Sequence, residues 1–311
     1  MPPSRPDARK AALSMMNDLV LGLVLSVASA FLFSVSNMFV ARGMSLQHVS
    51  GGVLATILFS SLMIFAVSIV TGEFLHIWSM GFYPALLFMF AGGLNFILGR
   101  GLNYTGMVLL GPSRGSTITS SQSLFAVFFG FLLIAEPLTL VGALGVMLSF
   151  FGTIMVTTGN DHGKRINSRG LLFSLSAAIF VGLSVVVIRA ADILTPLPVD
   201  GALISYLTAG VFYFALNIAR TRDIRRVVAG KRLGMLAAAG SASGLAQSAR
   251  FVALLVAPIV LVAPIITANP LFTMLLSFFT MRGVESLSGR LLVGAVLIVS
   301  GVVVISYSLG I

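Results

Sequence analysis

The stretch that decides the fold class is residues 18–41, which read DLVLGLVLSVASAFLFSVSNMFVA. Its only charged residue is Asp18. Crossing about 30 Å of hydrocarbon takes about 20 predominantly apolar residues in a helix. The sequence Ala28-Ser29-Ala30 fits the cleavage site of a signal peptide, but the apolar run continues past it to Arg42. We therefore interpret the stretch as a first membrane-spanning helix.

Similar apolar stretches follow along the rest of the chain. Hydrophobic residues make up 58% of the sequence and charged residues 9%, whereas a soluble domain has about 25% charged residues. The sequence therefore predicts an all-α membrane protein with ten transmembrane helices, a multi-pass protein of the plasma (inner) membrane. The predicted spans are 18–41, 49–71, 82–104, 108–134, 138–158, 169–190, 200–219, 233–254, 257–281 and 288–308.

Two segments of the chain resemble each other at an offset of about 149 residues. Ala135-Glu136-Pro137-Leu138-Thr139 is echoed by Val284-Glu285-Ser286-Leu287-Ser288, and a glycine-spaced helix follows each. Five spans per repeat is an odd number, so the second repeat must enter the membrane from the opposite face. Inverted repeats of this kind are typical of secondary transporters. The predicted divisions are an N-terminal tail (1–17), a first five-helix repeat (18–158), a linker (159–168) and a second five-helix repeat (169–311).

The segment Glu136-Pro137-Leu138-Thr139 and its weaker copy around Glu285 resemble the drug/metabolite transporter superfamily, specifically its ten-span EamA-type members. The resemblance covers residues 18–308. It implies the export or exchange of small metabolites, a group that includes amino acids, sugar phosphates and nucleotide sugars.

Three arginines lie about a helical turn or more inside predicted spans: Arg100, Arg114 and Arg250. An ionisable side chain inside a span costs about 2.5–3.5 kcal/mol on insertion scales and is a functional candidate. Guanidinium groups bind carboxylates and phosphates well, so we interpret these arginines as binding an anionic group of the substrate. The alternative is that each side chain reaches to the nearer membrane surface.

Uncharged polar residues supply the rest of the predicted binding cavity. The alternative for each of them is a hydrogen bond between helices, worth about 0.6 kcal/mol on average. These candidates are Asn37, Asn95, Asn103, Gln122, Gln247 and Asn269.

The remaining residues narrow the functional class. There are no cysteines, and no Asp, Glu or His lies deep within a span, so an enzyme is not expected and neither is a metal or cofactor. The absence of a mid-span carboxylate also argues against exchange of cationic drugs for protons. The net charge of +10 lies mainly beside the spans, which is typical of membrane proteins and does not indicate nucleic-acid binding.

The sequence therefore predicts a secondary transporter that moves a small polar metabolite with an anionic group by alternating access between two inverted repeats. Its partners would be that small-molecule substrate and membrane lipid, and the protein would be a monomer or homodimer. Two alternatives remain open: a flippase for a phosphorylated lipid headgroup, and an exporter of amino acids or other neutral or zwitterionic metabolites. The distribution of basic residues at the span ends favours placing both termini outside the cytoplasm. The resemblance to EamA-type proteins implies the opposite orientation, because these are usually drawn with both termini inside.

Overall fold

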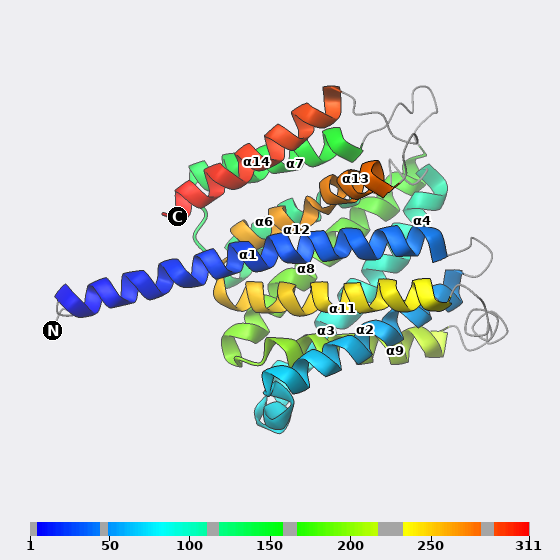
Figure 1. Cartoon of the computed structure of the whole chain (residues 1–311), viewed down its shortest axis with the longest axis horizontal. Helices are drawn as coiled ribbons and strands as arrows, with labels where there is room; N and C mark the ends of the chain where they lie inside the picture. Colours follow the sequence, from blue (N-terminus) through cyan, green and yellow to red (C-terminus); the bar gives the residue numbers. More distant parts are fainter. Residues whose placement is uncertain are drawn as a thin grey trace.

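The structure is a computed structural model that describes residues 5–43, 49–110, 118–157, 167–216, 233–280 and 289–310. These residues form helices that run side by side in one bundle (Figure 1) and contain no strand. In chain order the helices are α1 (Arg5–Gly43), α2 (Val49–Thr71), η2 (Glu73–Ser79), α3 (Phe82–Gly92), η3 (Gly93–Gly99), α4 (Arg100–Leu110), α6 (Gln122–Ile134), α7 (Leu140–Thr157), α8 (Ser168–Leu194), α9 (Pro198–Leu216), α11 (Leu233–Val256), α12 (Ile259–Thr267), α13 (Asn269–Thr280) and α14 (Gly289–Leu309).

Six helical stretches in the described part are long and apolar enough to cross a membrane. Three shorter apolar stretches lie at 122–134, 140–156 and 259–273. The all-α, multi-pass membrane class predicted from the sequence is thus confirmed. The six long stretches are 14–40, 52–71, 82–103, 168–194, 198–216 and 292–309.

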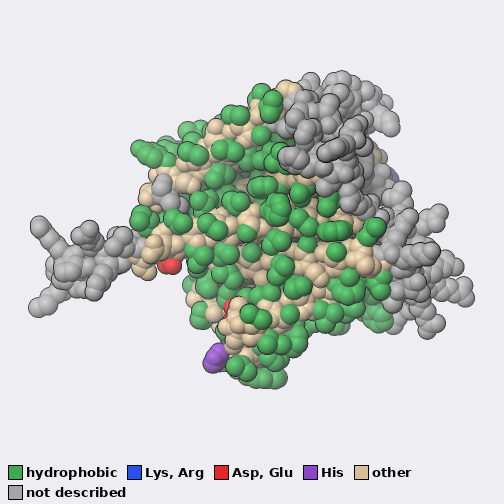
Figure 2. Space-filling view, in the orientation of Figure 1, with side chains coloured by type: hydrophobic (Ala, Val, Ile, Leu, Met, Phe, Trp, Pro, Cys, Tyr) green, Lys and Arg blue, Asp and Glu red, His purple; other side chains and the backbone are tan. Residues whose placement is uncertain are grey.

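The outer surface of the bundle is apolar. Hydrophobic side chains cover much of the face shown in Figure 2. The large hydrophobic side chains exposed on the molecule as a whole include Val70, Leu140 and Tyr307. Soluble monomers rarely expose apolar patches of more than a few hundred Å². Lipid chains are the solvent that such a surface requires.

Glycines allow the closest helix contacts. A Cβ atom at Gly145 would lie 2.7 Å from the carbonyl oxygen of Gly301, and one at Gly152 would lie 2.7 Å from that of Gly294. These two contacts join α7 to α14. Small residues drive helix association in membranes because they let the backbones approach closely.

Several boundaries differ from the predicted spans. The predicted division at 105–107 is wrong, because α4 continues to Leu110 and α6 begins at Gln122. Helix α1 begins at Arg5, so residues 5–17 continue the helix of the first span. The predicted span 257–281 is broken, because α12 ends at Thr267 and α13 begins at Asn269, directly before Pro270. Proline lacks the N–H group that would continue the helical hydrogen bonds, which explains the break.

The bundle has two ends that matter for the site. We call the terminal end the one that holds the start of α1 and the last turn of α14, where both chain ends lie in Figure 1. The turns at 135–139, 195–197 and 257–258 lie there too. The opposite end holds the last turn of α1 and the first turn of α2.

Candidate functional site

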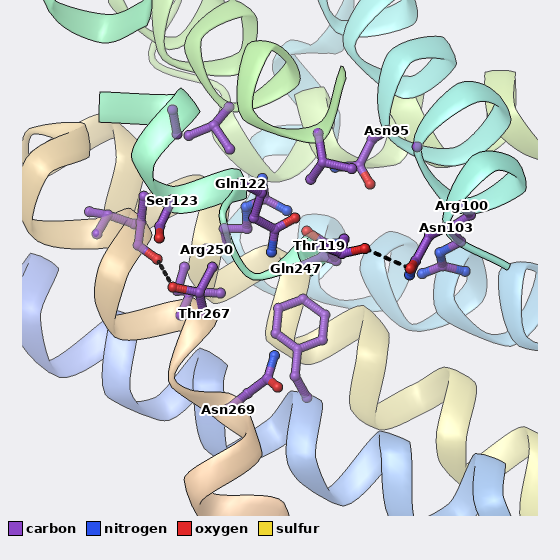
Figure 3. Close-up of a pocket in the computed structure, with 18 residues that line it drawn as sticks. Asn95, Arg100, Asn103, Thr119, Gln122, Ser123, Gln247, Arg250, Thr267 and Asn269 are labelled. Carbon is purple, nitrogen blue, oxygen red and sulfur yellow. Dashed lines mark hydrogen bonds between the residues drawn. The ribbon is translucent and has the colours of Figure 1, made fainter. Parts of the chain in front are cut away.

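A cavity of about 250 Å³ lies inside the bundle between helices from the two halves of the chain (Figure 3). The first half contributes side chains from α1, η3, α4 and α6, and the second half contributes α8, α11, α12 and α13. A second cavity of about 320 Å³ shares seven lining residues with the first, so the two adjoin. The second cavity reaches Val40, three residues before the end of α1, and therefore extends toward the opposite end.

Eight of the nine residues predicted to bind substrate line these two cavities, although they come from distant parts of the chain. Their role in binding remains a prediction. The ninth, Arg114, lies outside the described residues. The eight are Asn37, Asn95, Arg100, Asn103, Gln122, Gln247, Arg250 and Asn269.

Arg250 lies on α11 and is buried, with 7% of its surface exposed. It lines the first cavity, and no carboxylate of the described residues forms a salt bridge with it. Its guanidinium group therefore does not reach to the membrane surface, which was the alternative interpretation. A buried charge without a partner is unfavourable and needs a compensating anion.

Arg100 is held differently. Its Cζ atom lies 4.7 Å from the centre of the Phe96 ring, one helical turn earlier, in a cation–π contact. The Phe96 ring in turn packs edge-on against Tyr206, with 4.4 Å between ring centres. Arg100 is half-buried, and it lines both cavities. An aromatic support thus fixes this guanidinium at the cavity wall.

A π-helical segment, η3, carries Asn95 and Gly99 to the cavity. Such widened turns interrupt α-helices rarely and are frequent at functional sites. At its end a Cβ atom on Gly99 would lie 2.5 Å from the Val181 side chain, so glycine permits the close approach of α8. This packing places η3 and α8 on the same wall of the cavity.

The amides divide into paired and unpaired groups. Asn95 donates to the Ser184 hydroxyl at 3.1 Å, and Asn103 accepts from Thr119 at 2.8 Å. Both side chains are therefore hydrogen-bonded within the protein. The bond of Asn95 joins η3 to α8, as expected if this residue serves to hold helices together. Gln247 is 3% exposed, and its Oε1 atom has no hydrogen-bond partner. It lies one turn before Arg250 on α11, so an unpaired acceptor adjoins a cation that has no carboxylate partner in the described part of the chain.

An ion pair lies at the terminal end, where sequence reasoning placed no site. The Nε atom of Arg189 on α8 lies 2.9 Å from Oε1 of Glu136 in the turn between α6 and α7. Arg189 also donates to the carbonyl oxygens of Leu254 and, at 2.6 Å, Leu255 at the end of α11. Glu136 accepts the N–H group of Ile259 at 2.7 Å. We call this arrangement the clamp.

The clamp uses two helix ends as well as two charges. The last carbonyls of a helix lack internal donors and favour a cation, whereas the first N–H groups lack acceptors and favour an anion. Arg189 satisfies the end of α11, and Glu136 satisfies the start of α12. The available signal in the sequence was an arginine inside an apolar helix, because such a residue needs a partner.

No group of three or more His, Cys, Asp or Glu that could hold a metal ion occurs among the residues that the structure describes. The chemistry of the cavity is therefore that of guanidinium, amide and hydroxyl groups, which can bind a polar solute through charge and hydrogen bonds.

Comparison with known proteins identifies the superfamily. A protein solved by crystallography has the same fold, with a TM-score of 0.74 and 16% sequence identity over 93% of this chain and 98% of that chain. No curated protein matches the sequence. Residues 20–158 match the EamA-like transporter family, whose members are membrane transporters of small molecules. This match places the chain in the drug/metabolite transporter superfamily.

Proposed function

We propose that this protein is a secondary transporter that carries a small polar metabolite with an anionic group by alternating access between two inverted halves. The observation that carries this proposal is Arg250, a buried guanidinium that lines an internal cavity and has no carboxylate partner among the described residues. Such a group is costly to keep unless it serves a ligand. Arginine forms two parallel hydrogen bonds with a carboxylate or a phosphate, so either could be that ligand.

The cavity also suits the polar part of such a substrate. Oε1 of Gln247 is buried without a donor, so it would accept a hydrogen bond from a substrate hydroxyl or amino group. Drug-sized ligands occupy pockets of about 300–1,000 Å³, whereas this cavity has about 250 Å³. The first cavity alone therefore suits a small metabolite, and a larger ligand would also have to occupy the adjoining cavity of about 320 Å³.

The glycine contacts of α7 and α14 support two inverted halves. Gly145 and Gly294 are 149 residues apart, and so are Gly152 and Gly301. Gly145 contacts Gly301, and Gly152 contacts Gly294. Exchanging each glycine for its counterpart turns one contact into the other, as a two-fold axis between equivalent helices requires. With ten crossings, this axis would lie in the membrane plane.

The clamp and the cavities lie at different depths, which supports alternating access. The cavities extend toward the opposite end, whereas the clamp joins α6, α8, α11 and α12 at the terminal end. We infer that a transport cycle breaks the clamp to open the terminal end. The distribution of basic residues favours placing the opposite end on the cytoplasmic side.

The proposal is tested by ligand binding followed by transport. Purified protein is heated with a panel of carboxylates, phosphates, amino acids and organic cations, because a ligand that binds the native state raises the unfolding temperature. The responding compound is then offered to proteoliposomes, with Arg250→Gln protein as the control. We expect uptake of an anionic compound that Arg250→Gln abolishes. A response confined to neutral or zwitterionic compounds, and unaffected by that substitution, would support the exporter of such metabolites instead.

A second candidate function, a flippase for a phosphorylated lipid, is favoured by an apolar groove. Only apolar side chains from α1, α12, α13 and α14 line it, among them Val27, Ile265 and Phe272. Ile265 lies beside Ile266, which lines the polar cavity, so headgroup and acyl chain could occupy neighbouring sites. Scrambling of labelled phospholipid in the same proteoliposomes, without uptake of soluble anions, would favour this function.

A further inference from the structure

Asp192 has no described role in the cavity or the clamp, yet its surroundings are unusual. It lies near the end of α8 at the terminal end and is 1% exposed, and neither carboxyl oxygen has a hydrogen-bond partner among the described residues. An ionised carboxylate in that position loses its hydration and gains no hydrogen bond from the described residues, whereas a neutral acid loses much less hydration. Buried carboxyl groups in membrane proteins commonly belong to proton pathways.

Charged groups on several elements surround Asp192. Arg189 on the same helix and Glu73 on η2 act on it electrostatically. Glu73 is itself held by the N–H groups at the start of α9, at 2.9 and 3.2 Å. Arg189 is therefore the cation available to Asp192 within the described residues. The other charged residues described on helices packed against α8 are Arg100, Asp200 and Arg250.

Arg189 and Asp192 lie three residues apart on α8, so their side chains project from neighbouring positions on one face of the helix. In this structure Arg189 is bound to Glu136 and to carbonyl oxygens at the end of α11. Two carboxyl groups thus compete for one guanidinium. The closed clamp pairs it with Glu136, and no described residue forms a salt bridge with Asp192.

We propose that Asp192 is a proton-binding site that couples opening of the clamp to the release of one proton. This inference rests on the proposed transport by alternating access. While the clamp is closed, the Asp192 carboxyl group holds a proton. When the terminal end opens, Arg189 leaves Glu136 and pairs with Asp192, whose O–H bond breaks and whose proton passes to water at that end. Water then hydrates the Glu136 carboxylate.

The consequence is a transport cycle that responds to a proton gradient. Because each opening releases one proton, the ratio of open to closed molecules rises by up to about tenfold for each pH unit at the terminal end. If Glu136 were the group that took up the proton, the open-to-closed ratio would instead rise in acid, because a neutral Glu136 would no longer hold Arg189. The direction of the pH response therefore identifies the group that titrates.

The test measures a distance across the clamp as the pH is changed. The sequence has no cysteine, so Leu140→Cys at the start of α7 and Ile193→Cys at the end of α8 can be spin-labelled without removing other thiols. Both positions are exposed, at 87% and 62%. In nanodiscs we expect a longer distance to gain population as the pH rises. A population that ignores pH, or grows in acid, would overturn the proposal.

Two variants separate Asp192 from its neighbours. In Asp192→Asn the pH response should be lost and the short distance should persist, because the amide mimics the neutral acid. Asp200→Asn is the matched control: it removes another buried carboxyl group at the same end, keeps an acceptor for Ser68, and should retain the full response. An unchanged response in Asp192→Asn would refute the assignment.

A second measurement tests the same assignment without a variant, in case Asp192→Asn protein folds poorly. Infrared spectroscopy of the unsubstituted protein should show the carbonyl band of a protonated carboxylic acid that disappears as the long distance appears, and its absence would also refute the assignment. Failure here is distinguishable from failure of the transport proposal. Protein that carries anions into proteoliposomes but shows a pH-independent distance would keep the transport function and lose the proton site.

Discussion

Removing the charge of Arg250 should stabilise the protein in the absence of ligand. The same change should weaken its binding of anions. The side chain is 7% exposed and has no carboxylate partner among the described residues, so the folded protein bears part of the cost of an unpaired buried charge. Replacing a buried ion pair by hydrophobic residues of similar volume stabilises some proteins by about 1–4 kcal/mol, and we expect a gain at the lower end of that range when this charge is replaced by a neutral amide. At about 2–4 °C per kcal/mol in larger domains, Arg250→Gln should raise the unfolding temperature by several degrees.

The same substitution should weaken binding of a carboxylate or phosphate. A hydrogen bond to a charged group contributes about 1.5–3 kcal/mol, which corresponds to about 10–150-fold in the dissociation constant. The assay is thermal unfolding of detergent-purified protein with and without the anion. Arg100→Gln is the control, because Arg100 rests on Phe96 and its loss should not stabilise the protein. An Arg250→Gln protein that is no more stable than the parent and still responds to the anion would refute the reasoning.

Three further predictions concern the clamp, the loop after α2 and the α7–α14 contact. Glu136→Gln keeps an acceptor but loses the charge that holds Arg189 at 2.9 Å. Charged hydrogen bonds exceed neutral ones by about 1 kcal/mol, so the ratio of open to closed molecules in the spin-label measurement should rise about fivefold, and unaltered populations would contradict this. Burial raises the pKa of Glu73 in the folded protein above its ordinary value of 4.5. The contribution of protonated Glu73 to the free energy of unfolding is therefore fully present below pH 4.5 and is lost as the pH rises through the higher folded-state pKa. Glu73→Gln should therefore gain stability over the parent across that window in unfolding temperatures measured against pH, and a constant difference would argue against it. Gly152→Val should destabilise the protein by about 1–3 kcal/mol because its Cβ would lie 2.7 Å from a backbone oxygen of α14. Gly234→Val, with nothing within 4 Å, should cost much less in the same unfolding experiment.

The membrane class and most of the cavity residues could be predicted from the sequence. Apolar runs of about 20 residues need no knowledge of neighbours, because a single helix satisfies its own backbone in lipid. Arg100 and Arg250 stand out for a related reason, since any charge in such a run requires an explanation. The choice between lining a cavity and reaching to the membrane surface could not be made in the same way, because it depends on what packs around each side chain.

Asp192 shows most clearly why position along a helix is insufficient. In the sequence it lies near the end of a span, where a carboxyl group is expected to be hydrated. In the structure it is enclosed, because α8 packs against helices from both halves of the chain. The clamp is similar: Glu136 and Arg189 are 53 residues apart, and the pairing follows from the meeting of three helix ends. The sequence by itself thus determined the solvent of each helix and which polar groups need partners. Only the tertiary structure decided which partners they have, because burial and pairing depend on contacts between helices that are distant in the chain.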